Sequence, residues 1–348
     1  MGLSFLLYLS SGLFLGWSLG ASEASNFGTA VATKMIKFRT AAAISSTCII
    51  IGAVYAGAGT SQTLGELGGI TALAGAFMVA LSAALTTYWM VKFSIPVSTS
   101  QAIVGAIIGW NFYAGQQTDI SILSQIVSAW FLGPVFAGMI AIGLYSGLKF
   151  LFRRWPIHLL RKDCYTRIAL ILAGAFGSYS LGANNIANVM GVFVDSSPLH
   201  PLEFPLGLTL NKTQVLFLLG GIAIAIGIAT YSQRVIYTVG HTIMKLSPLM
   251  AWVVVASQGT VLFLFSSQGI QNFLLTHNLP ALPLVPVSST QAVIGAVMGL
   301  GIAKGGSSLN WAVLGKIGLS FIITPISTAV ICYISLFFLQ NVFNQVVY

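Results

Sequence analysis

Two near-copies of one polar phrase have the residue types needed to bind an anion. Residues 96–102 read Pro-Val-Ser-Thr-Ser-Gln-Ala, and residues 286–292 read Pro-Val-Ser-Ser-Thr-Gln-Ala. A Ser followed three residues later by Gln predicts a helix start, because each side chain can bond the backbone N–H of the other residue. A helix start offers N–H groups and the positive end of the helix dipole, which suit an anion. The pair therefore predicts one anion held between two helix starts by Ser98, Thr99, Ser100, Gln101, Ser288, Ser289, Thr290 and Gln291.

A second pair of polar clusters has the residue types of a cation site. Residues 22–26 read Ser-Glu-Ala-Ser-Asn after Gly20, and residues 184–188 read Asn-Asn-Ile-Ala-Asn after Gly182. Hard cations such as Na⁺ take carboxylate, amide, hydroxyl and carbonyl oxygens as ligands. The glycines predict helix breaks that would free backbone carbonyls. We expect cation binding or coupling at Ser22, Glu23, Asn26, Asn184, Asn185 and Asn188, with a Na⁺ site drawn from Glu23, Asn26, Asn184 and Asn188.

Glu23 is the only acid in these two clusters. An ionisable residue inside an apolar span is functional by default, so Glu23 would either bind a cation or carry a proton. The alternative interpretation is that both clusters are solvated loops at a membrane surface.

The composition predicts an all-α polytopic membrane protein in which these clusters lie between apolar helices. Of 348 residues, 56% are hydrophobic and 6% are charged, against about 25% charged in a soluble domain. Crossing the hydrocarbon layer takes about 20 apolar residues. Runs of suitable length lie near 3–20, 40–58, 70–92, 97–114, 122–152, 165–182, 213–231, 248–267, 286–302 and 310–340. The sequence therefore predicts about ten transmembrane helices.

The basic residues predict the orientation in the cell membrane. With both termini on the extracytoplasmic side, 14 of the 15 Lys and Arg residues lie on the cytoplasmic face, and Lys212 is the exception. This bias follows the positive-inside rule. It accounts for the net charge of +9 without a nucleic acid partner. The three cysteines lack metal-site spacing, and no motif of a hydrolase or nucleotide-binding enzyme occurs, so we expect no enzymatic activity.

The ten runs divide into two sets of five. We expect a first transmembrane repeat over 1–152, a basic cytoplasmic linker over 153–164 and a second repeat over 165–348, since both motif pairs recur in the same order. An odd number of spans inverts the second copy, which gives inverted repeats with broken helices and a site near the midplane. The alternative is a duplication that serves packing alone.

The motifs together resemble those of the inorganic phosphate transporter family, often called PiT. Its halves each carry a Gly-Ala-Asn-Asp-x-Ala-Asn type motif and a later Pro-Val-Ser-Thr-Thr-(His or Gln) type motif. Here these correspond to residues 20–31, 96–101, 182–188 and 286–291, and residues 234–240 also resemble the family's second half. The resemblance implies a symporter that imports phosphate with Na⁺ or H⁺ by alternating access, with the Ser/Thr phrases binding the anion and the Asn motifs binding the cation. A homodimer is a further family expectation.

Two departures from the family pattern keep the coupling ion and the substrate open. Ser22-Glu23 stands where the family has Asn-Asp, and Asn185 stands where it has Asp. Because a lost carboxylate changes the charge balance, Na⁺ and H⁺ coupling are both retained as predictions. Sulfate is the alternative substrate, since the family includes sulfate permeases, and arsenate also remains open. An anion channel is a weaker alternative, and an intramembrane enzyme is weaker still.

Overall fold

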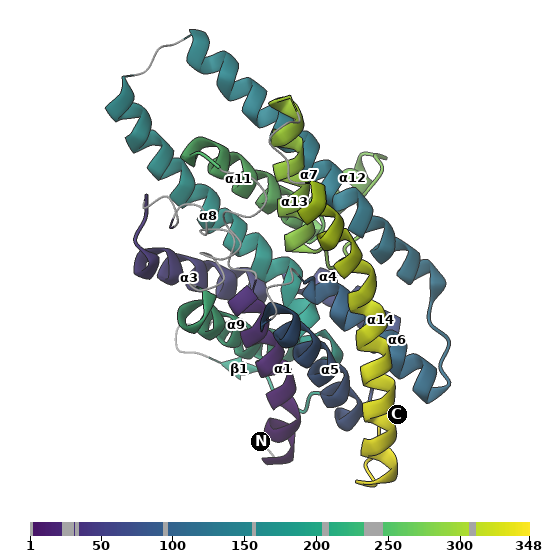
Figure 1. Ribbon diagram of the computed structural model, residues 1–348. Coiled ribbons are helices and arrows are strands. Elements are labelled where there is room, and N and C mark those ends of the chain that lie inside the picture. Colours follow the sequence, from purple (N-terminus) through teal and green to yellow (C-terminus); the bar gives the residue numbers. More distant parts are fainter. Residues whose placement is uncertain are drawn as a thin grey trace.

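The apolar runs of the chain form helices, because only a helix or a closed barrel satisfies every backbone N–H and C=O inside lipid. The computed structural model describes residues 3–22, 31, 35–92, 97–154, 158–203, 209–232, 246–305 and 311–348. Glu23, Asn26, Pro96 and residues 234–240 lie outside these ranges. In chain order (Figure 1) the elements are α1 (Leu3–Ser22), α3 (Phe38–Ala56), α4 (Ala58–Gly68), α5 (Leu73–Lys92), α6 (Thr99–Ala114), α7 (Ile120–Arg154), α8 (Leu159–Met190), the 3₁₀ turn η2 (Gly191–Phe193), β1 (Leu202–Glu203), β2 (Thr209–Leu210), α9 (Lys212–Thr230), α11 (Pro248–Leu264), α12 (Gln268–Thr276), α13 (Ser289–Ala303) and α14 (Trp311–Asn341).

The helix lengths confirm a polytopic all-α membrane protein. Within the described ranges, six helices are long and apolar enough to cross a membrane, namely α1, α3, α5, α7, α9 and α14. The α11–α12 pair, bent by 65°, would supply a seventh. Two further helices, α6 and α13, have only 16 and 15 residues. The count of ten spans therefore stays a prediction.

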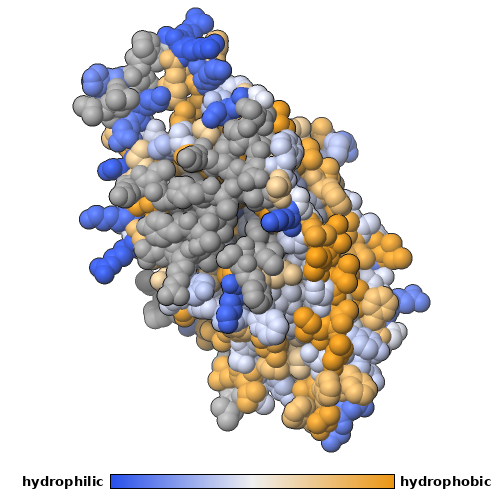
Figure 2. All heavy atoms as spheres, in the orientation of Figure 1, coloured by the Kyte–Doolittle hydropathy of each residue, from blue (hydrophilic) through white to orange (hydrophobic). Residues whose placement is uncertain are grey.

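The two chain ends lie at one end of the molecule, and the last turn of α7 and the first turn of α8 lie at the other (Figure 1). Most of the basic stretch expected as a linker is helical, because α7 runs to Arg154 and α8 begins at Leu159. Figure 2 shows hydrophilic residues gathered at this end and an apolar surface along α14.

Several of the closest helix pairs join one predicted repeat to the other. Pairs of this kind are α1 with α9, α3 with α8, α6 with α14, and α7 with α13. Glycines allow these close approaches. A Cβ at Gly20 would overlap the carbonyl oxygen of Ile224, and a Cβ at Gly182 would overlap that of Ile49.

The same relation recurs around the two short helices. A Cβ at Gly105 of α6 would overlap the carbonyl oxygen of Pro325 in α14, and a Cβ at Gly295 of α13 would overlap that of Pro134 in α7. Gly105 and Gly295 occupy matching places after the two Pro-Val-Ser phrases. Each short helix is thus held against the long, Pro-containing final helix of the other repeat.

The predicted helix break at Gly182 is wrong. Helix α8 runs without interruption through Gly182 and the Asn cluster to Met190, and α1 continues through Gly20 to Ser22. Gly182 therefore permits close packing and does not break its helix. The residues after Ser22 lie outside the described ranges, so a break just after Gly20 stays a prediction. The chain instead interrupts its helices at the starts of α6 and α13, whose first residues are buried.

Candidate anion and cation site

Ser98 and Ser288 cap the two short helices as the sequence predicts. Ser98 Oγ accepts the N–H of Gln101 at 3.3 Å, and Ser288 Oγ accepts the N–H of Gln291 at 3.2 Å. Both serines are fully buried. The other half of the predicted capping pattern is not formed, because Oε1 of each glutamine has no hydrogen-bond partner among the described residues. The glutamine side chains are therefore not used to complete the caps.

The two helix starts touch each other through equivalent atoms. Ser100 Oγ donates to the carbonyl oxygen of Val287 at 3.3 Å, and Thr290 Oγ1 donates to that of Val97 at 3.2 Å. In both cases the fifth residue of one phrase bonds the second residue of the other. Such reciprocal contacts are typical of a two-fold axis between equivalent surfaces. The two phrases, remote in sequence, thus form one buried cluster of hydroxyl groups.

Asn184 of α8 fixes the segment that leads into α13. Its Nδ2 donates to the carbonyl oxygen of Val285 at 3.1 Å, and its Oδ1 accepts the N–H of Val287 at 2.8 Å. Thr63 Oγ1 of α4 donates to the neighbouring Leu284 carbonyl at 2.6 Å. Because α8 and α4 hold this segment on two sides, the start of α13 has a defined position.

Asn185 and Asn188 join the Asn cluster to the α6 start. Asn188 Nδ2 donates to Ser100 Oγ at 2.8 Å and to Asn185 Oδ1 at 2.8 Å. Ser100 Oγ also lies 3.3 Å from Asn185 Oδ1. Both asparagines are fully buried. The second Asn motif and the first Pro-Val-Ser phrase therefore meet at Ser100.

Four buried polar atoms of this cluster have no hydrogen-bond partner within the described ranges. They are Asn185 Nδ2, Asn188 Oδ1, Gln101 Oε1 and Gln291 Oε1. A buried polar atom left unpaired costs about 1–3 kcal/mol, and such atoms are rare without a functional reason. One donor and three acceptors in a cluster rich in hydroxyl groups fit an oxyanion accompanied by a cation.

The remaining predicted residues divide into three groups. Thr99 and Ser289 are buried at the first positions of α6 and α13. Ser22 does not join the cluster, since its Oγ donates to the carbonyl oxygens of Ser18 and Leu19 in its own helix. Glu23 and Asn26 lie outside the described residues, so their part in a Na⁺ site stays a prediction.

Sequence reasoning missed one buried amide. Gln258 of α11 is fully buried, and neither of its amide atoms has a hydrogen-bond partner in the described part of the chain. Helix α11 packs against α8 and α13, which carry site residues. A single glutamine within an otherwise apolar span was the signal that could have indicated it.

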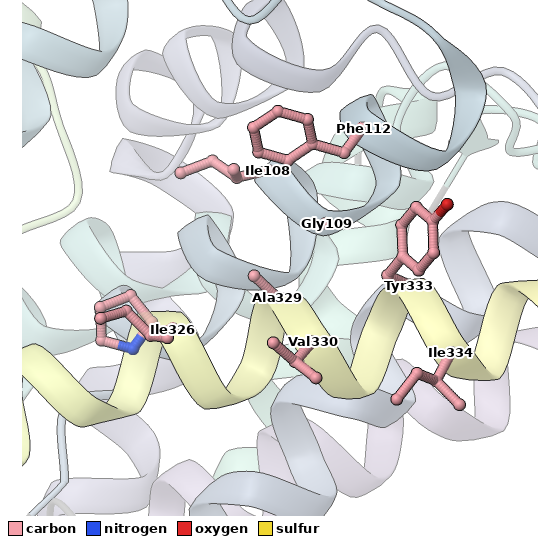
Figure 3. Close-up of a pocket in the computed structure, with 9 residues that line it drawn as sticks. Ile108, Gly109, Phe112, Ile326, Ala329, Val330, Tyr333 and Ile334 are labelled. Carbon is pink, nitrogen blue, oxygen red and sulfur yellow. The ribbon is translucent and has the colours of Figure 1, made fainter.

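A separate apolar hollow of about 630 Å³ lies between α6 and α14 (Figure 3). Side chains from both helices line it, among them Ile108, Phe112, Ile326, Val330, Tyr333 and Ile334. A phosphate ion needs many hydrogen-bond donors, and this lining is almost entirely hydrocarbon. The anion site is therefore the buried polar cluster and not this hollow.

Comparisons with known proteins agree with the geometry. A model of the phosphate transporter family matches residues 19–164, 160–332 and 281–347. The chain is 28% identical to a predicted phosphate permease of Methanocaldococcus jannaschii, over 95% of this chain and 97% of that protein. It is 25% identical to one of Thermococcus kodakarensis, over 94% and 96% of the two chains.

A solved structure described as the sodium-dependent phosphate transporter has the same fold. Its TM-score to this chain is 0.79 at 22% identity, over 97% of this chain and 98% of that one. A transporter family covers nearly the whole sequence, which confirms the expectation that the protein is not an enzyme. The chain belongs to the phosphate transporter family.

Proposed function

We propose that this chain is a secondary active symporter that imports inorganic phosphate together with a cation by alternating access. The observation that carries the proposal is the reciprocal contact between the starts of α6 and α13, through Ser100 with Val287 and Thr290 with Val97. Two helix starts that meet inside an apolar protein direct N–H groups and dipoles at one point. Family membership and the names of the relatives support phosphate as the substrate.

The anion would be bound by neutral donors. Hydroxyl groups of the two phrases and the N–H groups of the first helical turns would surround a tetrahedral oxyanion from several directions. No Lys or Arg occurs in either phrase. The negative charge would therefore be balanced by the two dipoles and by a co-bound cation, which would leave with the anion.

The cation would lie beside Asn188. Its Oδ1 is a buried acceptor without a partner among the described residues, and amide oxygens are good ligands for hard cations. The similar solved structure is that of a sodium-dependent phosphate transporter, which supports Na⁺. H⁺ is the alternative, in which Glu23 would accept the proton that phosphate carries at neutral pH and sulfate lacks.

The double variant Ser98→Ala with Ser288→Ala tests the anion site. We expect uptake of labelled phosphate to fall about a hundredfold or more, because two hydrogen bonds to a charged ligand are lost. The matched control is Ser267→Ala, which removes the same cap from α12, and it should transport normally. Normal uptake by the correctly inserted double variant would refute the proposed anion site.

Competition experiments distinguish phosphate from sulfate or arsenate as the substrate, and uptake against a gradient distinguishes a transporter from a channel. Labelled phosphate uptake is measured with excess sulfate or arsenate, with and without Na⁺. Strong inhibition by sulfate would count against phosphate selectivity. Accumulation against a gradient that an ionophore abolishes would exclude a channel.

A further inference from the structure

A hollow of about 210 Å³ lies beside the central cluster, where α4, the turn after α8 and the first turn of α9 meet. It is distinct from the hollow between α6 and α14 and shares no lining residue with it. None of the residues predicted to bind anion or cation lines it. Its lining comes from both predicted repeats.

The lining is acidic and rich in oxygen atoms. Glu66 and Asp195 supply two carboxylates, Ser61 and Thr213 supply hydroxyl groups, and no basic side chain is part of it. Both carboxylates are on the exposed side of the hollow. Gln62 Nε2 donates to Glu66 Oε1 at 3.0 Å, which leaves the amide oxygen of Gln62 available. These are the ligand types of a hard cation, and they would repel phosphate.

A buried hydroxyl group gives independent support for a ligand. Ser61 is 4% exposed, and its Oγ has no hydrogen-bond partner among the described residues. The hydroxyl faces the wall formed by Gly191, where a Cβ would lie 3.6 Å from Ser61 Oγ. Such a buried acceptor implies a partner that is a water molecule or a hydrated ion.

The size of the hollow determines how a cation would be held. A hollow of about 210 Å³ has room for several water molecules. Direct coordination needs ligand oxygens packed within about 2.6 Å of the ion. The space is thus suited to an ion that keeps most of its water and is bound through that water.

The hollow adjoins the central cluster through α8. Gly191 follows Asn188 by three residues, which is about one helical turn. Ser61 Oγ of α4 lies against Gly191 at the start of η2, and Asn188 Oδ1 lies about one turn earlier, in α8. Both acceptors lack a partner within the described ranges. An ion in the hollow would be one turn from the amide assigned above to the coupling cation.

We propose that this hollow, lined by Glu66, Asp195 and Ser61, is a capture site for a hydrated alkali-metal cation before the cation reaches the central cluster. The delivery step depends on the proposed symport, whereas binding of the ion does not. Because the ion keeps its water, the site discriminates little between Na⁺ and K⁺.

Sodium NMR line broadening on the purified protein tests binding without any transport. We expect the double variant Glu66→Gln with Asp195→Asn to lose a component of the broadening, and K⁺ to displace Na⁺ at similar concentrations in the wild type. The matched control is Glu203→Gln, which removes a carboxylate outside the hollow. Equal broadening in the double variant and the wild type would overturn the proposal.

A variant that fills the hollow but keeps both carboxylates tests whether the ion needs the space as well as the charges. Gly65 lines the hollow, and a Cβ there would meet only Asp195 Oδ2, at 4.0 Å. Gly65→Met keeps both carboxylates and should lose the same broadening component, whereas Gly65→Ala should keep it. Retention of that component in Gly65→Met would contradict a site in this hollow.

Uptake measurements then test delivery. In the double carboxylate variant the Na⁺ concentration for half-maximal phosphate uptake should rise about tenfold, the low end of what electrostatic focusing gives, with an unchanged maximal rate. An unchanged Na⁺ dependence together with lost broadening would reject delivery but keep binding. Na⁺-independent uptake in the wild type would instead count against Na⁺ symport.

Discussion

At the scale of single residues, the Asn cluster contains one structural residue, Asn184, and two candidate ligands, Asn185 and Asn188. Both amide atoms of Asn184 bond the backbone of residues 285–287. Asn185 and Asn188 bond each other and Ser100, and each keeps one amide atom without a partner in the described ranges. Substitution of Asn184 should therefore lower the stability of the protein, whereas substitution of Asn185 or Asn188 should change the cation dependence of transport.

Asn184→Ala is expected to destabilise the protein by about 2–6 kcal/mol. The change leaves the Val285 carbonyl and the Val287 N–H buried and unpaired, at about 1–3 kcal/mol per group. A fall in melting temperature of the detergent-purified protein would measure the cost. A variant with the wild-type melting temperature would show that the start of α13 does not depend on this asparagine.

Asn185→Asp should increase the apparent affinity for Na⁺ about tenfold, since it adds a charge beside the proposed cation. Two donors, Asn188 Nδ2 and Ser100 Oγ, already face Oδ1 of this residue and would stabilise a carboxylate. The measurement is the Na⁺ concentration for half-maximal uptake. Ser247→Asp is the control, because it adds a carboxylate at the cap of α11, where either residue is accepted. An unchanged Na⁺ dependence would remove Asn185 from the cation site.

At the scale of helices, packing depends on glycines that face backbone carbonyls. Gly105→Ala should lower stability by about 1–3 kcal/mol, the usual cost of overpacking, because the new methyl group meets the Pro325 carbonyl, which cannot rotate away. Gly318→Ala is the control on α14 itself, where a Cβ meets nothing within 4 Å. Equal melting temperatures for the two variants would refute the close packing of α6 on α14.

The sequence predicts the local features of these helices, such as their caps, better than it predicts which helices pack together. Serine caps at Ser98 and Ser288 follow from spacing alone, since a cap involves residues three apart. Gly182 was misread as a break, because a glycine before a polar cluster serves equally for a break or for close contact. The contact that decides between these comes from Ile49, in the other half of the chain. The repeated phrase predicted that the two helix starts meet around one anion, but it did not predict the bonds between them, such as that of Ser100 with Val287.

At the scale of the whole molecule, the orientation prediction can be tested with a natural thiol. Among the three cysteines Cys164 is exposed, Cys48 is partly buried and Cys332 is buried. A membrane-impermeant maleimide should label Cys164 in inverted vesicles and not in intact cells, because the basic stretch is expected on the cytoplasmic face. In a Cys164→Ser background, Tyr348→Cys should show the opposite labelling. Labelling of Cys164 in intact cells would reverse the predicted topology.

The exchange of partners between the repeats also limits how the transporter can move. Rocking one repeat against the other would separate α6 from α14 and α7 from α13, and the glycine contacts oppose this. The units that move are therefore expected to combine helices of both repeats. One such unit would be α6 with α14, and the other α7 with α13, each carrying one of the two helix starts.

The packing of first-repeat helices against second-repeat helices also has a consequence for synthesis of the protein. The ribosome makes α1, α3 and α6 well before α9, α8 and α14, the helices that cover their glycine-lined surfaces. During synthesis, the first half of the chain therefore lies in the bilayer with these glycine-lined surfaces uncovered. We expect insertion chaperones or lipid tails to cover these surfaces until α8, α9 and α14 have been synthesised.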